Sequence, residues 1–346
     1  MWSKLVRPIG EVSCRYESVR LATSLVPGEP EGPCVKTEVP GPKSKDLLCE
    51  LKKIAGEDVD FTDVEKESCV INQPPGAPKL SILSFHGAFH GRTLGALSTT
   101  HSKHCRENKK EDEKCLAEVE ELIEKYKKKD RPVAGVIIEP IQSEGGDHEA
   151  SPEFFQCLQK ICKKNGAALL IDEVQTGCGP TGKFWCHQHF NLECPPDVVT
   201  FSKKMQMGGY FHTEEMTPKQ PYRVFNTWMG DPGKLILLEN ILYVIKTQKL
   251  LEQVERTGKR LKRGLIEIEN EFPCIINSVR GRGTFLAVNT PKTELRDDIL
   301  RRMKQKGVQS GGCGVSSIRL RPALVFQEHH ADIFLDVFRQ VLRETK

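Results

Sequence analysis

The chain has 346 residues, of which 38% are hydrophobic and 28% charged, with 51 basic against 47 acidic residues. This composition is typical of a globular protein with its own core, and a formal net charge of +4 gives no electrostatic footprint for nucleic acid. No apolar run approaches the roughly 20 residues that cross a bilayer, so we expect neither a nucleic-acid nor a membrane partner.

The first residues allow two interpretations. Residues 1–27 contain scattered arginines and serines, which is typical of a mitochondrial transit peptide. Glu11 and Glu17 argue against one, because such peptides are poor in acidic residues. Composition alone leaves both interpretations open. A proline-rich extended arm follows, and a short helix is expected at 45–55.

The next part of the chain predicts an α/β arrangement. A short apolar strand and a glycine-punctuated loop are expected within 80–93. Helices are then predicted at 111–130 and 151–164, where apolar residues recur at helical spacing. Three apolar runs accompany these helices, at 133–140, 167–177 and 197–205. Such an alternation favours a parallel sheet with helices on its faces.

The pattern changes after about residue 233. One long helix is predicted at 234–270, and further helices at 293–306 and 329–345. Apolar runs at 278–288 and 317–326 separate these helices. We interpret this part as an α+β domain.

Three of the apolar runs lead into polar groups, namely Glu139, Asp172 and Lys203. Ligands of parallel α/β sheets bind outside the carboxyl ends of the strands, so these side chains are predicted to converge on one site. Taken alone, an aspartate at a strand end is more often a helix cap, and a lysine is more often a surface residue.

Longer motifs around these residues resemble those of class III aminotransferases. The main ones are "IDEVQTGCGPTGKFW" at 171–185, "DVVTFSKKMQMGG" at 197–209 and "FHGAFHGRT" at 85–93. The match is extended by "EPIQSEGGD", "FNTWMGDP", "RGRGTF" and "SIRLRP". Within the family, "GAFHGRT" and "FSKKM" are similar to the 4-aminobutyrate type.

The resemblance implies an α/β fold, that of a fold type I pyridoxal-phosphate-dependent transferase. A mainly parallel, cofactor-binding large domain would span 66–233, and a smaller α+β domain would span 234–346. Residues 28–65 would form an N-terminal arm and part of an incomplete small domain. The family also implies that 1–27 is a transit peptide directing the chain to the mitochondrial matrix.

The resemblance further implies the catalytic residues. Lys203 would form a Schiff base with pyridoxal 5'-phosphate and move the substrate proton. Lys204 is its rival, because the wider class III pattern places the lysine four residues before the first glycine. The closer 4-aminobutyrate pattern selects Lys203. Asp172 would pair with the pyridinium nitrogen and keep it protonated.

Other matching positions would hold the cofactor and the substrates. Phe89 would stack on the ring, with His90 beside the cofactor, and Gln175 would reach the phenolic oxygen. Thr227 would donate to the phosphate of the partner subunit's cofactor, which implies a homodimer.

Arg92 would hold the carboxylate of an ω-amino acid, and Arg319 would hold a carboxylate of the 2-oxo acid. Glu144 would neutralise Arg319 while the ω-amino acid is bound. The implied reaction moves the amino group of 4-aminobutyrate, or of a similar ω-amino acid, to 2-oxoglutarate.

One long stretch of the family is absent between about 55 and 66 of this chain. In the 4-aminobutyrate type it contains paired cysteines that hold an iron–sulfur cluster. No C-x-x-C pair occurs among the 13 cysteines here, so we expect no cluster and no other metal site. The absent stretch also contains the loop that cradles the cofactor phosphate. An alternative hypothesis is therefore a truncated variant that cannot seat the cofactor and acts at most as a partner subunit.

Overall fold

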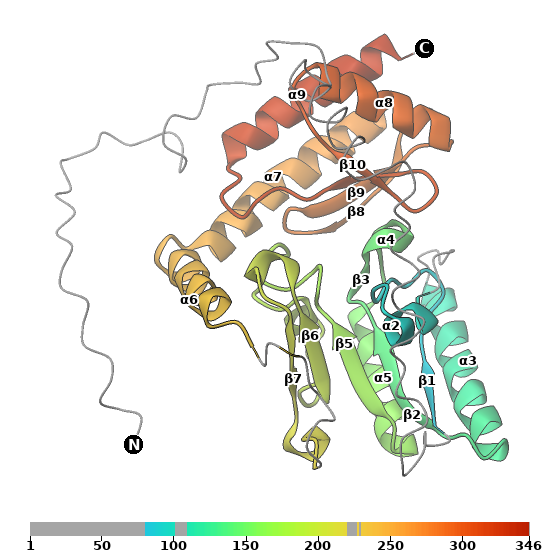
Figure 1. Ribbon diagram of the computed structural model, residues 1–346. Helices are drawn as coiled ribbons and strands as arrows, with labels where there is room; N and C mark the ends of the chain where they lie inside the picture. Colours follow the sequence, from blue (N-terminus) through green and yellow to red (C-terminus); the bar gives the residue numbers. More distant parts are fainter. Residues whose placement is uncertain (1–79, 101–108, 220–226, 228–229, 346) are drawn as a thin grey trace, which may run out of the picture. The chain divides into compact units, whose positions relative to one another are not determined.

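The computed structural model describes residues 80–100, 109–219, 227 and 230–345 (Figure 1). The expected transit peptide, the arm, the helix at 45–55 and the position of the absent stretch all lie outside these residues. Within the described part of the chain, no helix combines the length and apolar character needed to cross a membrane.

A five-stranded sheet has the order β1-β2-β5-β6-β7. Its strands are β1 (Ser81–Leu83), β2 (Val133–Ile138), β5 (Ala168–Asp172), β6 (Val198–Phe201) and β7 (Gly209–His212). The first four run parallel, and β7 is antiparallel to β6. The three long apolar runs thus form neighbouring strands, which confirms the predicted parallel sheet.

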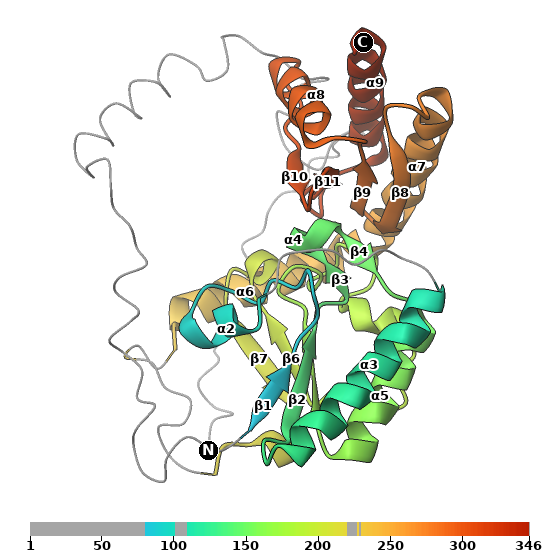
Figure 2. The same ribbon diagram turned by 90° about the vertical axis from the view of Figure 1, so that its right-hand side faces the viewer.

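Helices α3 (Lys109–Lys128) and α5 (Pro152–Asn165) lie side by side against the sheet (Figure 2). Helix α5 begins at a serine cap, since Ser151 Oγ accepts a hydrogen bond of 3.1 Å from the backbone N–H of Phe154. It ends at Gly166, whose φ of 66° is left-handed. Both predicted helices are confirmed within a few residues.

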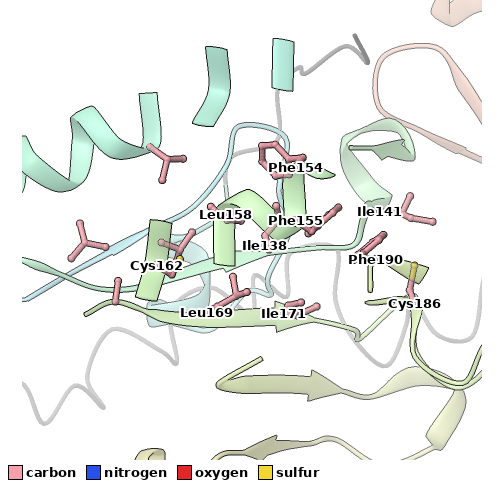
Figure 3. Packing of buried hydrophobic residues seen from close by; sticks show 14 of the residues in the cluster. Ile138, Ile141, Phe154, Phe155, Leu158, Cys162, Leu169, Ile171, Cys186 and Phe190 are labelled. Atoms are coloured by element: carbon pink, nitrogen blue, oxygen red, sulfur yellow. The ribbon is translucent and has the colours of Figure 1, made fainter. Parts of the chain in front are cut away.

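The core between α5 and the sheet combines aliphatic and aromatic side chains (Figure 3). Phe155 of α5 stacks on Phe190, with 3.9 Å between the ring centroids and 3° between the planes. Leu169 and Ile171 of β5 are buried beneath them. This packing holds the carboxyl end of β5, and hence Asp172, in a fixed position.

A small hairpin follows β2. Its strands β3 (Ile141–Gln142) and β4 (His148–Glu149) flank the one-turn helix α4 (Ser143–Gly146). The turn ends at Asp147, which has the left-handed φ of 58° that short polar residues tolerate. A second short helix, α2 (Leu94–Ser98), follows the loop after β1.

The C-terminal part contains an antiparallel sheet of order β10-β11-β9-β8. Its strands are β8 (Asn277–Arg282), β9 (Phe285–Asn289), β10 (Gly311–Cys313) and β11 (Ser317–Leu320). Helices α7 (Leu250–Glu271), α8 (Thr293–Gln305) and α9 (Glu328–Glu344) enclose a second apolar core with this sheet (Figure 1). The predicted α+β character is confirmed, whereas the exact domain boundaries stay predictions.

The prediction of one long helix at 234–270 was wrong. The chain forms α6 (Pro232–Thr247) and then α7, and the two are separated where Lys249 takes a left-handed φ of 52°. The break lets α7 turn its apolar face, including Leu261 and Leu265, into the C-terminal core. No glycine or proline marks the break at Lys249 in the sequence. The helical spacing of apolar residues therefore predicted one continuous helix.

Candidate active site

Three polar groups gather where β2, β5 and β6 end. Glu139 follows β2, Asp172 is the last residue of β5, and Lys203 lies two residues beyond β6. These strands are adjacent and parallel, so their carboxyl ends share one edge of the sheet. The predicted convergence of the strand ends is therefore present.

Asp172 is held by three donors. Its Oδ1 accepts hydrogen bonds from the backbone N–H of Val174 (3.1 Å) and from Thr200 Oγ1 (2.9 Å). Its Oδ2 lies 2.7 Å from Nδ1 of His90, whose side chain is only 2% exposed. A proton on Nδ1 of His90 would donate to this carboxylate oxygen. No described residue hydrogen-bonds the buried Nε2 of His90.

Glu139 joins two loops beneath the site. Its Oε1 accepts from the backbone N–H of Phe89 (2.8 Å), and its Oε2 accepts from that of Ser143 (3.2 Å). Burial raises the pKa of Glu139 to about 8, and the negative charges of Asp172 and Glu144 add to this against the two backbone donors. Sequence reasoning placed Glu139 at a strand end but gave it no role.

Glu144 and Arg319 form an ion pair across the site. Nη1 of Arg319 donates to Oε1 of Glu144 at 2.8 Å, and Nε2 of Gln175 donates to the same oxygen at 3.3 Å. Partial burial of Glu144 opposes its ionisation. The bond and charge of Arg319, with Gln175 and Lys203, outweigh it, so the pKa of Glu144 lies below its ordinary value. Gln175 thus contacts Glu144, which is a predicted substrate-binding residue.

Lys203 begins a 3-10 turn with a left-handed φ of 47°. Partial desolvation lowers the pKa of its amine, and the charge of Arg319 adds to this, while Glu144 and Glu139 oppose it. The pKa of Lys204 is also lowered by burial, and the positive charges of Arg321 and Lys203 add to this. Of these two lysines, Lys203 is therefore the one that Glu144 and Glu139 influence.

The remaining predicted residues are less closely joined to this cluster. Phe89 is half-buried and reaches the cluster through its backbone bond to Glu139. Arg92 is exposed and makes no ion pair with the other residues that the structure describes. Thr227 is exposed in a turn.

Comparison with known proteins fits this geometry. The sequence model of the class III aminotransferase family matches residues 103–342. This chain belongs to the class III aminotransferases. The α/β arrangement is accordingly that of fold type I, and the α/β prediction is confirmed.

Relatives of this class III aminotransferase include mitochondrial 4-aminobutyrate aminotransferase of Mus musculus, which is 50% identical over 312 residues. The aligned region covers 83% of this chain and 62% of that protein. A 4-aminobutyrate aminotransferase of Dictyostelium discoideum is 47% identical over 82% of this chain and 62% of its own length. The chain thus spans less than two thirds of these relatives.

Among solved structures, lysine aminotransferase from M. tuberculosis in the internal aldimine form superposes with a TM-score of 0.71. It is 30% identical, and the match covers 79% of this chain and 69% of that one. The likeness in fold therefore extends over most of the chain.

Class III aminotransferases use pyridoxal phosphate. The surroundings of Asp172, where the pyridine ring of that cofactor would bind, fit this group. A carboxylate offers about four lone-pair positions, and the described donors use three of them on Asp172. Oδ2 therefore keeps room for one further donor, such as a pyridinium N–H. Of the positions expected to contact the phosphate, Thr227 is described by the structure, and the others lie outside the described residues.

Proposed function

We propose that this chain is a transaminase that moves the amino group of 4-aminobutyrate, or of a similar ω-amino acid, to 2-oxoglutarate. The observation that supports this best is the convergence of Asp172, Lys203 and the Glu144–Arg319 pair in a class III aminotransferase. The names of the relatives from Mus musculus and Dictyostelium discoideum support the same substrate class.

Pyridoxal phosphate, when bound, supplies the electron sink that makes the amine-bearing carbon acidic. In the proposed site, Asp172 Oδ2 would hold the proton at the ring nitrogen, and Phe89 and His90 would help to hold the ring. Nζ of Lys203 would hold the cofactor and, when free, would move the proton of the amine-bearing carbon. A lowered amine pKa suits both tasks, because only the unprotonated amine is a nucleophile or a base.

The two arginines would sort the substrates by their carboxylates. Arg92 would bind the single carboxylate of the ω-amino acid, and Arg319 would bind the additional carboxylate of the 2-oxo acid. When no such carboxylate is present, Glu144 neutralises Arg319 through the 2.8 Å bond. Opening that pair is inexpensive, because both side chains are partly exposed, at 25% for Arg319 and 32% for Glu144.

We also propose that the active form is a homodimer whose interface includes α6. Large apolar side chains cover this helix and are exposed: Leu235, Ile236, Leu237, Leu242, Tyr243 and Val244. Ile236 is 62% exposed and Tyr243 66%, which is unusual for a helix of a folded protein. Thr227, expected to contact the partner subunit's cofactor, lies just before this helix.

The compartment that fits best is the mitochondrial matrix. The curated relative from Mus musculus is named as mitochondrial. The composition of residues 1–27 is compatible with a transit peptide, although those residues lie outside the described part of the chain.

A transamination assay tests the proposal. The purified chain is incubated with pyridoxal phosphate, 4-aminobutyrate and 2-oxoglutarate, and glutamate is measured. We expect glutamate formation by the wild type and by Lys204→Ala, and none by Lys203→Ala. If the wild type neither forms glutamate nor retains the cofactor, the alternative hypothesis of a truncated, inactive variant is supported instead.

A further inference from the structure

A second ion pair lies directly beside the Glu144–Arg319 pair. Asp147, which ends the α4 turn, accepts a hydrogen bond through Oδ1 from Nη2 of Arg321. Arg319 and Arg321 flank Leu320, which is buried in the C-terminal core. Arg319 lies in β11 and Arg321 directly follows its last residue, Leu320. Residues two apart in an extended chain point to the same side, which is consistent with both arginines reaching the α4 turn.

The two pairs differ in how firmly they are held. The side chain of Asp147 is fully buried and that of Arg321 is 19% exposed, whereas Glu144 and Arg319 are 32% and 25% exposed. The guanidinium of Arg321 also lies 3.1 Å from the ring centroid of the buried Phe285. Because Arg321 is held on both sides, the Asp147 pair is the fixed one and the Glu144 pair is the one able to open.

A third arginine secures the end of the same turn. Arg280 is buried and donates through Nε to the carbonyl oxygen of Asp147 (3.1 Å) and through Nη2 to that of Gly146. The same Nη2 donates to Asn289 Oδ1 (2.8 Å) and Ser317 Oγ (2.9 Å). The last carbonyls of α4 are therefore tied to strands β8, β9 and β11.

The backbone of the turn is also tied to β10 and its own hairpin. The N–H of Gly314, next to β10, donates to the carbonyl oxygen of Glu144 at 2.9 Å. The N–H of Asp147 donates to that of Gln142 at 2.7 Å. Glu144 thus projects from a turn whose backbone is fixed at both ends.

We propose that Asp147 and Arg321, supported by Arg280, act as positioning residues that keep the Glu144 turn docked on β11 while the Glu144–Arg319 pair opens for the acceptor's carboxylate. This inference rests on the proposed function for its substrate. It explains why the chain places two arginines, two residues apart, opposite two carboxylates three residues apart. The Glu144–Arg319 pair opens so that Arg319 can bind the acceptor. The Asp147–Arg321 pair stays closed and holds the turn in place.

The first test measures the turn itself and requires no activity. Arg321→Lys keeps the charge but loses the planar fork that reaches Asp147 and Phe285. The control is Arg282→Lys, since Arg282 joins Glu149 of the same hairpin to β8. Hydrogen exchange of peptides covering 142–147 and 311–314 should rise about tenfold or more in Arg321→Lys and not in the control. Unchanged exchange in Arg321→Lys would overturn the proposal.

The second test separates positioning from general stability. Arg321→Lys and Asp147→Asn should each raise KM for 2-oxoglutarate by about tenfold or more, with changes in kcat and in KM for 4-aminobutyrate below about threefold. Arg282→Lys should leave all three values unchanged. Equal changes in KM for both substrates would contradict the proposal. If the wild type does not transaminate, the proposed function fails, and the exchange measurement still decides on the turn. If Arg321→Lys does not fold, Asp147→Asn takes its place in the exchange measurement and alone carries the kinetic test.

Discussion

Nδ1 of His90 lies 2.7 Å from Oδ2 of Asp172, and this bond joins the loop after β1 to the end of β5. The imidazole is almost fully buried, so the contact is shielded from water. It fixes the plane of the carboxylate and leaves one acceptor position of Oδ2 open. His90 therefore helps, with Val174 and Thr200, to set the orientation of the Asp172 carboxylate.

Replacing His90 by glutamine is expected to lower kcat for transamination by about 10- to 100-fold, because a hydrogen bond to a charged group contributes about 1.5–3 kcal/mol. His187→Gln is the matched control. His187 makes a similar bond of 2.9 Å to the buried Glu173, outside the proposed site. Steady-state kinetics of both variants check this, and an equal loss in the two would show that His90 has no special role.

Glu139 predicts a pH dependence of stability. Its pKa in the folded chain is about 8, above the ordinary 4.5, so the folded state binds the proton more tightly than the unfolded state. The stabilisation by this group is complete below about pH 4.5 and is lost as the pH rises to about 8. The loss is on the order of 4 kcal/mol.

In urea titrations between these pH values, the free energy of unfolding of the wild type should therefore fall relative to that of Glu139→Gln. The exposed Glu118 of α3 provides the control, since Glu118→Gln should follow the wild type at each pH. A constant difference between wild type and Glu139→Gln would show that the buried carboxyl does not titrate in this range.

Glu144→Gln should change substrate preference without removing activity. The variant keeps the shape of the side chain but leaves the charge of Arg319 uncompensated. We expect KM for 2-oxoglutarate to fall and KM for 4-aminobutyrate to rise, each by up to about fivefold, because an exposed ion pair contributes up to about 1 kcal/mol. Competition kinetics with the two substrates measure this, and parallel changes in both KM values would exclude the proposed switch.

The apolar face of α6 predicts the oligomeric state. Ile236→Asp and Tyr243→Asp are expected to convert a dimer into a monomer, because each places a charge in a buried interface. Ile266→Asp on α7 is the control, since Ile266 is also exposed, at 41%, but lies outside α6. Light scattering after gel filtration gives the mass of each. A wild-type monomer, or dimers in all variants, would contradict the interface.

Much of this fold follows from local pattern. The runs around Ile138, Ile171 and Val199 are continuous and apolar, as strands buried on both faces require, and they became adjacent parallel strands. Because such strands end at one edge, the grouping of Asp172 and Lys203 followed directly from the sequence.

Other features depend on contacts between residues far apart in the chain, which local sequence patterns do not reveal. The break at Lys249 has no glycine or proline signal, and it follows from the packing of α7 on the C-terminal sheet. The bonds of Arg280 and Arg321 to the α4 turn join residues more than 130 positions apart. A charged side chain in a sequence is usually interpreted as exposed, so their burial was not foreseen.

The proposed role of Lys203 as the residue that anchors the cofactor can be tested directly by locating the reduced cofactor adduct. The purified chain is mixed with pyridoxal phosphate, reduced with borohydride and digested, and the modified peptide is located by mass spectrometry, with Lys204→Ala as the control. We expect a stoichiometric pyridoxyl group on Lys203 in both proteins. Modification of Lys204, or trace modification spread over surface lysines, would contradict it.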